Sequence, residues 1–144
     1  MSGIRALFQG MNISASAMKA ERARVDIIAK NIAHSGTTRM PDTGEPYRRE
    51  IVHFAPIYKQ NTNGGYDVDG VKVDQVMKDF TTPFELINDP GHIDADVEGN
   101  VRMPNVNTVR EMAELITAMR AYEANVQVAE NFEKMAQMGL NLAK

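Results

Sequence analysis

The feature that most constrains this chain is a long stretch near its C-terminus that a helix can traverse without interruption. After Pro104 the chain contains no further proline, and it contains no glycine before Gly139. Asn105 or Asn107 can cap the first turn of such a helix by accepting a backbone N–H bond. At 1.5 Å per residue the helix would be about 55 Å long, more than one small domain spans. Its apolar residues recur at steps of three, four or seven and form one stripe: Val109, Met112, Ile116, Met119, Val126, Ala129 and Phe132.

The N-terminal stretch, residues 3–33, carries a matching pattern. Five apolar residues stand at intervals of seven: Ile4, Met11, Met18, Val25 and Ile32. Leu7 and Ile28 occupy the companion positions of the heptad, and Ser14 and Glu21 interrupt it. This spacing predicts a helix of about 45 Å with a coiled-coil-like seam.

Between these helices lie about 70 residues, too many for a simple connection between paired helices. Alternating apolar residues predict strands at 47–58 and 68–77, joined by the turn residues 61–65, and a short strand at 97–103. Residues 79–96, which include Pro83 and Pro90, are predicted to be mostly loop. We therefore predict an α+β fold. Residues 1–35 and 104–144 form the paired-helix core domain, and residues 36–103 form a small β-hairpin module inserted between the helices.

Composition excludes several classes of protein. The net charge is −3 and no dense basic patch is present, which argues against a nucleic-acid partner. No apolar run approaches the roughly 20 residues of a membrane span. Cysteine is absent, so the chain has no disulfide and no thiolate site. The N-terminus has no continuous apolar signal core, which predicts a cytoplasmic protein or one exported without a cleaved signal.

One short segment could bind a metal ion. His92, Asp94 and Asp96 alternate along the chain, as ligands of a divalent ion can on an extended segment. No further ligands are arranged around them, so we interpret the segment as an acidic solvated loop and expect no metal, no cofactor and no enzymatic activity. A metal-dependent enzyme that uses these three residues stays open as a weaker hypothesis.

Three segments of the sequence resemble a known family. Residues 16–33 read SAMKAERARVDIIAKNIA, residues 103–112 read MPNVNTVREM and residues 120–126 read RAYEANV. They resemble the terminal motifs of the bacterial flagellar axial proteins, which build the rod, the hook and their junctions. The C-terminal motif and the short length are most similar to subunits of the proximal rod.

The resemblance implies a structural subunit that assembles helically into the hollow drive shaft and transmits torque from the basal-body ring to the distal rod and hook. It implies that the terminal helices order only on assembly, and that the chain leaves the cell through the flagellar type III export apparatus and resides in the periplasmic part of the basal body. The implied partners are copies of itself, the other rod proteins FlgB, FlgF and FlgG, and the ring–rod junction protein FliE.

From the apolar stripes we expect the terminal helices to pair within a subunit and to bury their remaining faces against neighbouring subunits. The predicted assembly interface consists of Ile4, Leu7, Met11, Met18, Val25, Ile28, Ile32, Val109, Met112, Ile116, Met119, Val126 and Phe132. The alternative left open by the residues alone is a soluble helical adaptor that closes into a small oligomer.

Overall fold

The computed structural model describes the backbone of residues 2–61 and 64–142, and the side chains of residues 7–61 and 64–141. The elements follow one another as α1 (Ser2–Ala33), β1 (Glu50–Gln60), β2 (Tyr66–Lys78), β3 (Glu85–Asn88), β4 (Asn100–Met103) and α2 (Thr108–Leu142). The predicted α+β fold with two long terminal helices around a small β-hairpin region is confirmed.

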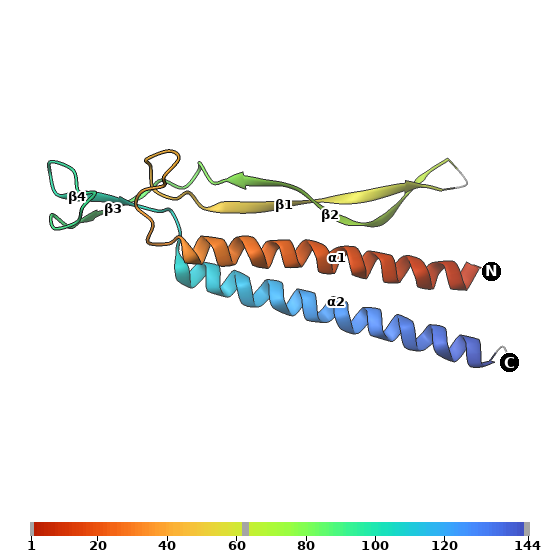
Figure 1. The fold of residues 1–144 in the computed structure, drawn as a ribbon. Coiled ribbons are helices and arrows are strands. Elements are labelled where there is room, and N and C mark those ends of the chain that lie inside the picture. Colours follow the sequence, from red (N-terminus) through yellow and green to blue (C-terminus); the bar gives the residue numbers. More distant parts are fainter. Residues whose placement is uncertain (1, 62–63, 143–144) are drawn as a thin grey trace.

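The molecule is elongated, and α1 forms its middle layer (Figure 1). Helix α2 lies along one side of α1, and the β1–β2 hairpin lies along another, so that α1 contacts all three elements. Both chain termini lie at one end of the molecule, and the β3–β4 pair lies beyond the opposite end of the helices.

The helices begin and end close to where the sequence predicts. Asn107 caps α2, because its Oδ1 accepts the backbone N–H of Arg110 at 3.0 Å, which satisfies a donor that has no partner within the helix. Helices of 32 and 35 residues span about 48 and 52 Å at 1.5 Å per residue. The two helices are therefore matched in length.

The strands differ from the prediction in extent and in number. The first strand begins at Glu50 rather than residue 47, because Tyr47 and Arg49 are buried in contacts outside the hairpin. Strand β3 lies within the segment predicted as loop, where it pairs antiparallel with β4 from Glu85↔Met103 to Asn88↔Asn100. The prediction missed β3 because a four-residue strand between two prolines offers too few residues to show alternation.

Strand β1 contains Pro56, which the sequence marks as a bend or an edge position. Pro56 lies opposite Val71, and the β1–β2 register shifts on both sides of it, between His53 and Phe54 and between Ile57 and Tyr58. Proline donates no hydrogen bond to the ladder, and bulges of this kind tolerate it. The hairpin follows α1 for most of its length, and the Val71 backbone N–H donates to Ser16 Oγ at 3.0 Å.

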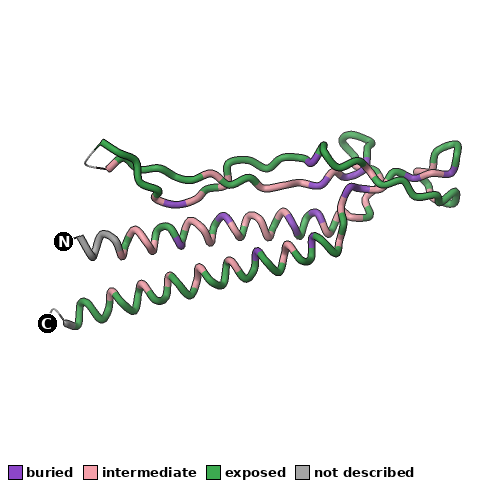
Figure 2. The backbone as a smooth tube through the Cα atoms, turned by 180° about the vertical axis from the view of Figure 1, so that it is seen from behind, coloured by how far each residue is buried: buried purple, intermediate pink, exposed green. Residues whose placement is uncertain are grey.

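Few apolar side chains are buried within the subunit. Among the described side chains the buried apolar ones are Ala20, Ile28, Tyr47, Val101 and Ala118. Figure 2 shows that buried positions concentrate where the helices meet the β-region, while α2 is largely exposed toward the C-terminus. Most of the large apolar surface of the chain is therefore left outside the subunit's own core.

Candidate assembly surface

The two helices pair in antiparallel orientation with a constant register. At one end of the pair, Asn31 Nδ2 donates to Glu111 Oε2 at 2.9 Å. Toward the termini, Gly10 faces the ring of Phe132 so closely that a Cβ at position 10 would overlap it. Because 31 minus 10 and 132 minus 111 both equal 21, neither helix slips relative to the other between these two contacts.

Where the helices face each other, the fully buried residues are mostly small or polar, and Phe132 is a large apolar exception. Ser14 and Asn31 of α1 are buried, as are Glu111 and Ala118 of α2. Small residues allow helices to approach closely, but they contribute little apolar burial. Pairing within the subunit therefore uses only a small part of the apolar surface of the helices.

A buried polar cluster joins the helices where they meet the β-region; we call it the base network, and it comprises Asn31, Tyr47, Arg49, Asn105 and Glu111. Arg49 Nε donates to Glu111 Oε1 at 2.6 Å, and the Glu111 side chain is almost completely buried. Arg49 also forms an ion pair with Glu114 at 3.2 Å. A buried ion pair is stable only when its remaining hydrogen-bonding groups are satisfied, and these additional contacts satisfy them.

Asn31 connects α1 to the chain entering β1. Its Nδ2 donates to the Glu50 carbonyl, and its Oδ1 accepts both the Glu50 backbone N–H and the Tyr47 hydroxyl, each at 2.9 Å. Burial, and then the negative charges of Glu50 and Glu111, raise the pKa of Tyr47 well above its ordinary value. The hydroxyl therefore keeps its proton and remains a donor.

Asn105 connects the approach to α2 with the middle of the chain. Its Oδ1 accepts the Arg49 backbone N–H at 2.8 Å, and its Nδ2 donates to the carbonyls of Asp79 and Thr82 at 3.0 Å each. The base network thus joins α1 and α2 to the start of β1 and to the segment that follows β2.

The first half of the predicted stripe on α2 is not buried against α1, although Phe132 farther along it contacts Gly10. Val109 is 76% exposed, Met112 53%, Ile116 54% and Met119 49%; we call these four residues the outer stripe. The prediction that the outer stripe forms the seam within the subunit is wrong. Periodicity identifies an apolar face, and in this chain most of that face stays exposed, with Met119 bordering α1 only at the surface, while Glu111 and Ala118 are buried.

The other predicted interface residues have mixed positions. Ile28 is buried within the subunit at 4% exposure. Ile4 lies in α1, but its side chain is outside the described residues. The remaining residues are partly exposed: Leu7, Met11, Met18, Val25, Ile32, Val126 and Phe132.

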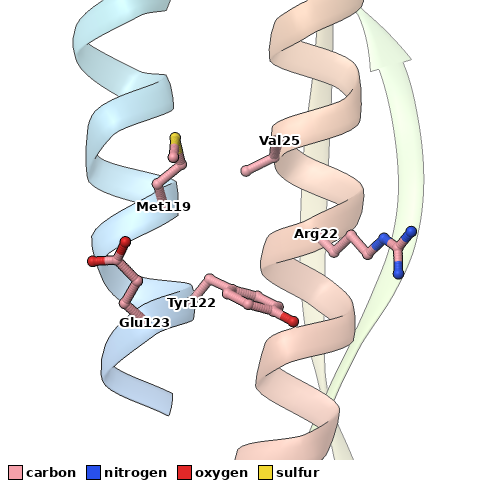
Figure 3. A pocket seen from close by; sticks show the side chains of 5 residues that line it. All are labelled: Arg22, Val25, Met119, Tyr122 and Glu123. Carbon is pink, nitrogen blue, oxygen red and sulfur yellow. The ribbon is translucent and has the colours of Figure 1, made fainter. Parts of the chain in front are cut away.

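A groove of about 250 Å³ lies between the helices (Figure 3). Val25 of α1 and Met119 and Tyr122 of α2 supply its apolar lining, and Arg22 and Glu123 border it on opposite helices. We call these five residues the helix groove. Val25 and Met119, from the two predicted stripes, are brought together here at a surface rather than in a closed core.

The exposed apolar surface of α2 continues toward the C-terminus beyond the outer stripe. Four further large apolar residues are exposed at 42–69%: Val128, Met135, Met138 and Leu140. Exposed apolar surface on this scale indicates a contact with another molecule. None of the helices in the described part of the chain has an apolar stretch sufficient to cross a bilayer.

His92, Asp94 and Asp96 stabilise a turn. Asp94 Oδ2 accepts the Thr38 hydroxyl at 2.8 Å, and His92 Nδ1 accepts the Asp94 backbone N–H at 3.1 Å. Asp96 Oδ1 accepts two backbone N–H groups, from Glu98 and Asn100. Within residues 7–61 and 64–141 no three His, Asp or Glu side chains are gathered as metal ligands would be.

Sequence reasoning missed the base network. Arg49 stands within a predicted strand, and Glu111 stands in the first turn of a predicted helix, where an acidic residue is commonly explained by the helix dipole. An acidic residue on the face of a helix that meets its partner would have been the signal. Recognising that face requires the register of the helix pair, which the sequence does not give.

Comparison with known proteins gives two matches to family models. Residues 11–39 match the family described as "Flagella basal body rod protein". Residues 97–142 match "Flagellar basal body rod FlgEFG protein C-terminal". These two segments cover much of α1 and all of α2.

The chain also aligns over nearly its whole length with flagellar basal-body rod proteins named FlgC. It is 39% identical to the FlgC protein of Borreliella burgdorferi, over 93% of this chain and 95% of the relative. It is 37% identical to the FlgC protein of Bacillus subtilis, over 95% and 98%, and 35% identical to that of Escherichia coli O6:H1, over 96% and 99%. The antiparallel terminal helices, the exposed apolar face of α2 and these alignments together show that the chain belongs to the FlgC family of flagellar basal-body rod proteins.

Proposed function

We propose that the chain is a non-enzymatic structural subunit of the proximal rod, built into a helical, hollow drive shaft by contacts between its terminal helices and those of neighbouring subunits. Membership of a family of basal-body rod proteins supports the rod role. The observation that supports the assembly route is the inverted distribution of side chains on α2. Most of its large apolar residues are exposed, while the small Ala118 and the polar Glu111 are buried within the subunit and Phe132 contacts Gly10 of α1.

In this proposal residues 1–35 and 104–144 form the inner domain, and residues 36–103 form the outer module. The outer stripe and the exposed residues of α2 bury against neighbouring subunits, together with the partly exposed residues of α1. Fully burying a Val, Ile or Met side chain contributes about 1.5–3 kcal/mol. Because a surface on one part of the subunit meets a different surface on the next, the contact is heterologous and builds a helix rather than a closed ring.

The proposed partners are copies of this chain, the rod proteins FlgB, FlgF and FlgG and the junction protein FliE. The chain would reach them in the periplasmic part of the basal body through the flagellar export apparatus, without a cleaved signal. A small closed oligomer is not favoured, because the relatives are named as rod proteins.

The outer stripe provides the direct test. We expect Ile116→Asp, at a position 54% exposed, to leave the free energy of unfolding of the isolated chain within about 0.5 kcal/mol of wild type and to prevent its incorporation into basal bodies. The control is Arg120→Asp on the exposed part of the same helix, outside the stripe. Normal incorporation of the Ile116→Asp chain would contradict this assembly surface.

A second test addresses order before assembly. Since the paired faces of the helices contribute little apolar burial, we expect weaker hydrogen-exchange protection across residues 7–20 and 122–141 than near the base network in the dilute monomer, and full protection of these residues in isolated rods. Residues near the base network should be protected in both states. Strong protection of residues 7–20 in the monomer would contradict ordering on assembly.

A further inference from the structure

The loop between β3 and β4, residues 89–99, presents two large apolar side chains directly to solvent; we call it the tip loop. Ile93 is 95% exposed and Val97 is as exposed as in an extended chain, at 106%. Both lie at the end of the molecule that is farthest from the chain termini. This apolar surface is separate from the outer stripe on α2.

Hydrogen bonds order the backbone of the tip loop, from which these side chains project. The backbone of Asp89 is hydrogen-bonded to Gly99, and that of Asp96 to Asn100, each at 2.9 Å. The contacts of Asp94 with Thr38 and of Asp96 with Glu98 and Asn100 fix the loop further. A loop already ordered loses little conformational entropy on binding.

The connection from the tip loop to the helices is also fixed. Arg48 lies between the rings of Phe80 and Phe84, at 4.6 and 4.1 Å from their centroids. Arg48 Nη1 and Asn105 Nδ2 both donate to the Asp79 carbonyl, at 3.2 and 3.0 Å. The tip loop is therefore presented at a defined orientation to α2, which a contact repeated from subunit to subunit requires.

The charge around the tip loop indicates what kind of surface it fits. Residues 85–100 contain five acidic residues and no lysine or arginine. Helix α1, in contrast, contains five basic residues and two acidic ones. Two of its exposed cations, Lys19 and Arg22, form no ion pair with any described side chain.

We propose that the tip loop of one subunit docks on the helix groove of a second copy, with Ile93 and Val97 against Val25 and Met119 and with Glu98 near Arg22. Arg22 lines this groove from α1, with its guanidinium turned away from α2, and Glu123 lines it from α2 (Figure 3). The acidic loop approaches from the α1 side, because Glu123 would repel it. The contact rests on the proposed rod function and adds to it a second heterologous interface, made by the β-region.

Because the chain has no cysteine, introduced cysteines test this contact without background. Chains carrying Val97→Cys and chains carrying Val25→Cys are co-expressed in a flagellated bacterium that lacks its own copy, and isolated basal bodies are treated with an oxidant. We expect a disulfide-linked dimer that contains one chain of each kind, since a disulfide requires Cβ atoms within about 4.5 Å. The control replaces Val97→Cys by Asp42→Cys, an exposed position outside the tip loop, and should give no dimer.

A charge exchange gives an independent measurement. We expect Arg22→Glu to lower incorporation into basal bodies two- to fivefold, as for an exposed ion pair turned repulsive, and Glu98→Arg in the same chain to restore it. The control Arg120→Glu, on α2, should leave incorporation unchanged, so that Glu98→Arg has no defect to restore in that chain.

The outcomes distinguish a failure of the tip-loop contact from a failure of the proposed rod function. Basal bodies that contain both cysteine chains without the mixed dimer, or an Arg22→Glu defect that Glu98→Arg does not restore, would overturn the tip-loop contact and leave the rod function standing. Absence of the unmodified chain from basal bodies would overturn the rod function and this contact with it.

Discussion

The helix pair differs strongly between its two ends. At the base, Glu111 is fully buried, Asn31 is 1% exposed and Tyr47 is 3% exposed. Asn31 is hydrogen-bonded to both Glu111 and Tyr47, and Glu111 is also hydrogen-bonded to Arg49. Toward the termini, Met135 is 45% exposed, Met138 58% and Leu140 69%. Large apolar groups of α2 are exposed at both ends, since Val109 beside the base is 76% exposed, but only the base also contains a buried polar network.

This difference assigns separate tasks to the two ends. Hydrogen bonds are directional, so the base network specifies one register of the helices and one attachment of the β-region. Apolar burial is non-directional and, near the termini, is largely left for other molecules to complete. A subunit that must adopt one fold and also bind its neighbours benefits from separating the hydrogen bonds that specify its fold from the apolar surface that neighbours bury.

Removing the buried carboxylate of the base network should have the largest effect on stability. Glu111→Ala leaves Arg49 buried with only Glu114 as an ionic partner and removes an acceptor from Asn31. We expect the free energy of unfolding to fall by about 3–5 kcal/mol, measured by urea denaturation. The matched control is Glu123→Ala on the exposed face of the same helix, which should cost less than about 0.5 kcal/mol. Equal effects of the two substitutions would show that the base does not dominate the stability of the subunit.

A second comparison uses two apolar residues that the sequence placed in one interface. Ile28 is 4% exposed and Val109 is 76% exposed. We expect Ile28→Ala to lower the free energy of unfolding by about 2–4 kcal/mol and Val109→Ala to change it by less than about 0.5 kcal/mol. Thermal unfolding of the two purified variants measures both. A large loss for Val109→Ala would mean that the outer stripe is covered within the subunit after all.

The same pair shows what the sequence could and could not predict. Heptad spacing identified both helices, and the turn residues between two alternating segments identified the β1–β2 hairpin. Spacing does not reveal which face of a helix meets its partner in the same chain and which meets another subunit. The pairing face here uses Gly10, Ala118 and Glu111, residues that a pattern of apolar positions assigns to solvent.

The base network could not be predicted for a related reason. Arg49 and Glu111 are 62 residues apart, and only the folded chain brings them together. Asn105 is an instructive intermediate case. The sequence offered it as a helix cap, whereas the structure gives that role to Asn107 and uses Asn105 to bridge Arg49 and Asp79.

Asp79, whose carbonyl accepts a hydrogen bond from Asn105 of the base network, should make a smaller and pH-dependent contribution to the free energy of unfolding. Burial alone would raise the pKa of Asp79, but hydrogen bonds from Thr82 and Thr81 outweigh it and hold the pKa below its ordinary value of 3.8. A carboxyl with a lowered pKa in the folded state stabilises that state above its unfolded pKa, and the stabilisation is lost as the pH falls through the folded pKa.

We therefore expect Asp79→Ala to cost about 1–2 kcal/mol at pH 7 and progressively less below pH 3.8, measured by urea denaturation across a pH series. Asp42→Ala, at an exposed position, serves as the control and should show neither the loss nor its pH dependence. A cost that persists unchanged in acid would mean that the side chain acts through packing rather than through its charge.

The smallest effect is expected toward the termini, where Gly10 meets Phe132. Alanine favours a helix over glycine by about 0.8–1 kcal/mol, but a Cβ at position 10 would overlap the Phe132 ring and force it to rotate away. Gly10→Ala should therefore have little net effect in the wild-type chain and stabilise a Phe132→Ala chain by about 0.5–1 kcal/mol. Urea denaturation of the four chains measures the coupling, and Ala29→Gly, on the exposed side of α1, controls for helix propensity alone. If Gly10→Ala stabilised both chains equally, the two helices would already be separated at this contact in the monomer. The register set by the base network would then extend to the termini only within the rod.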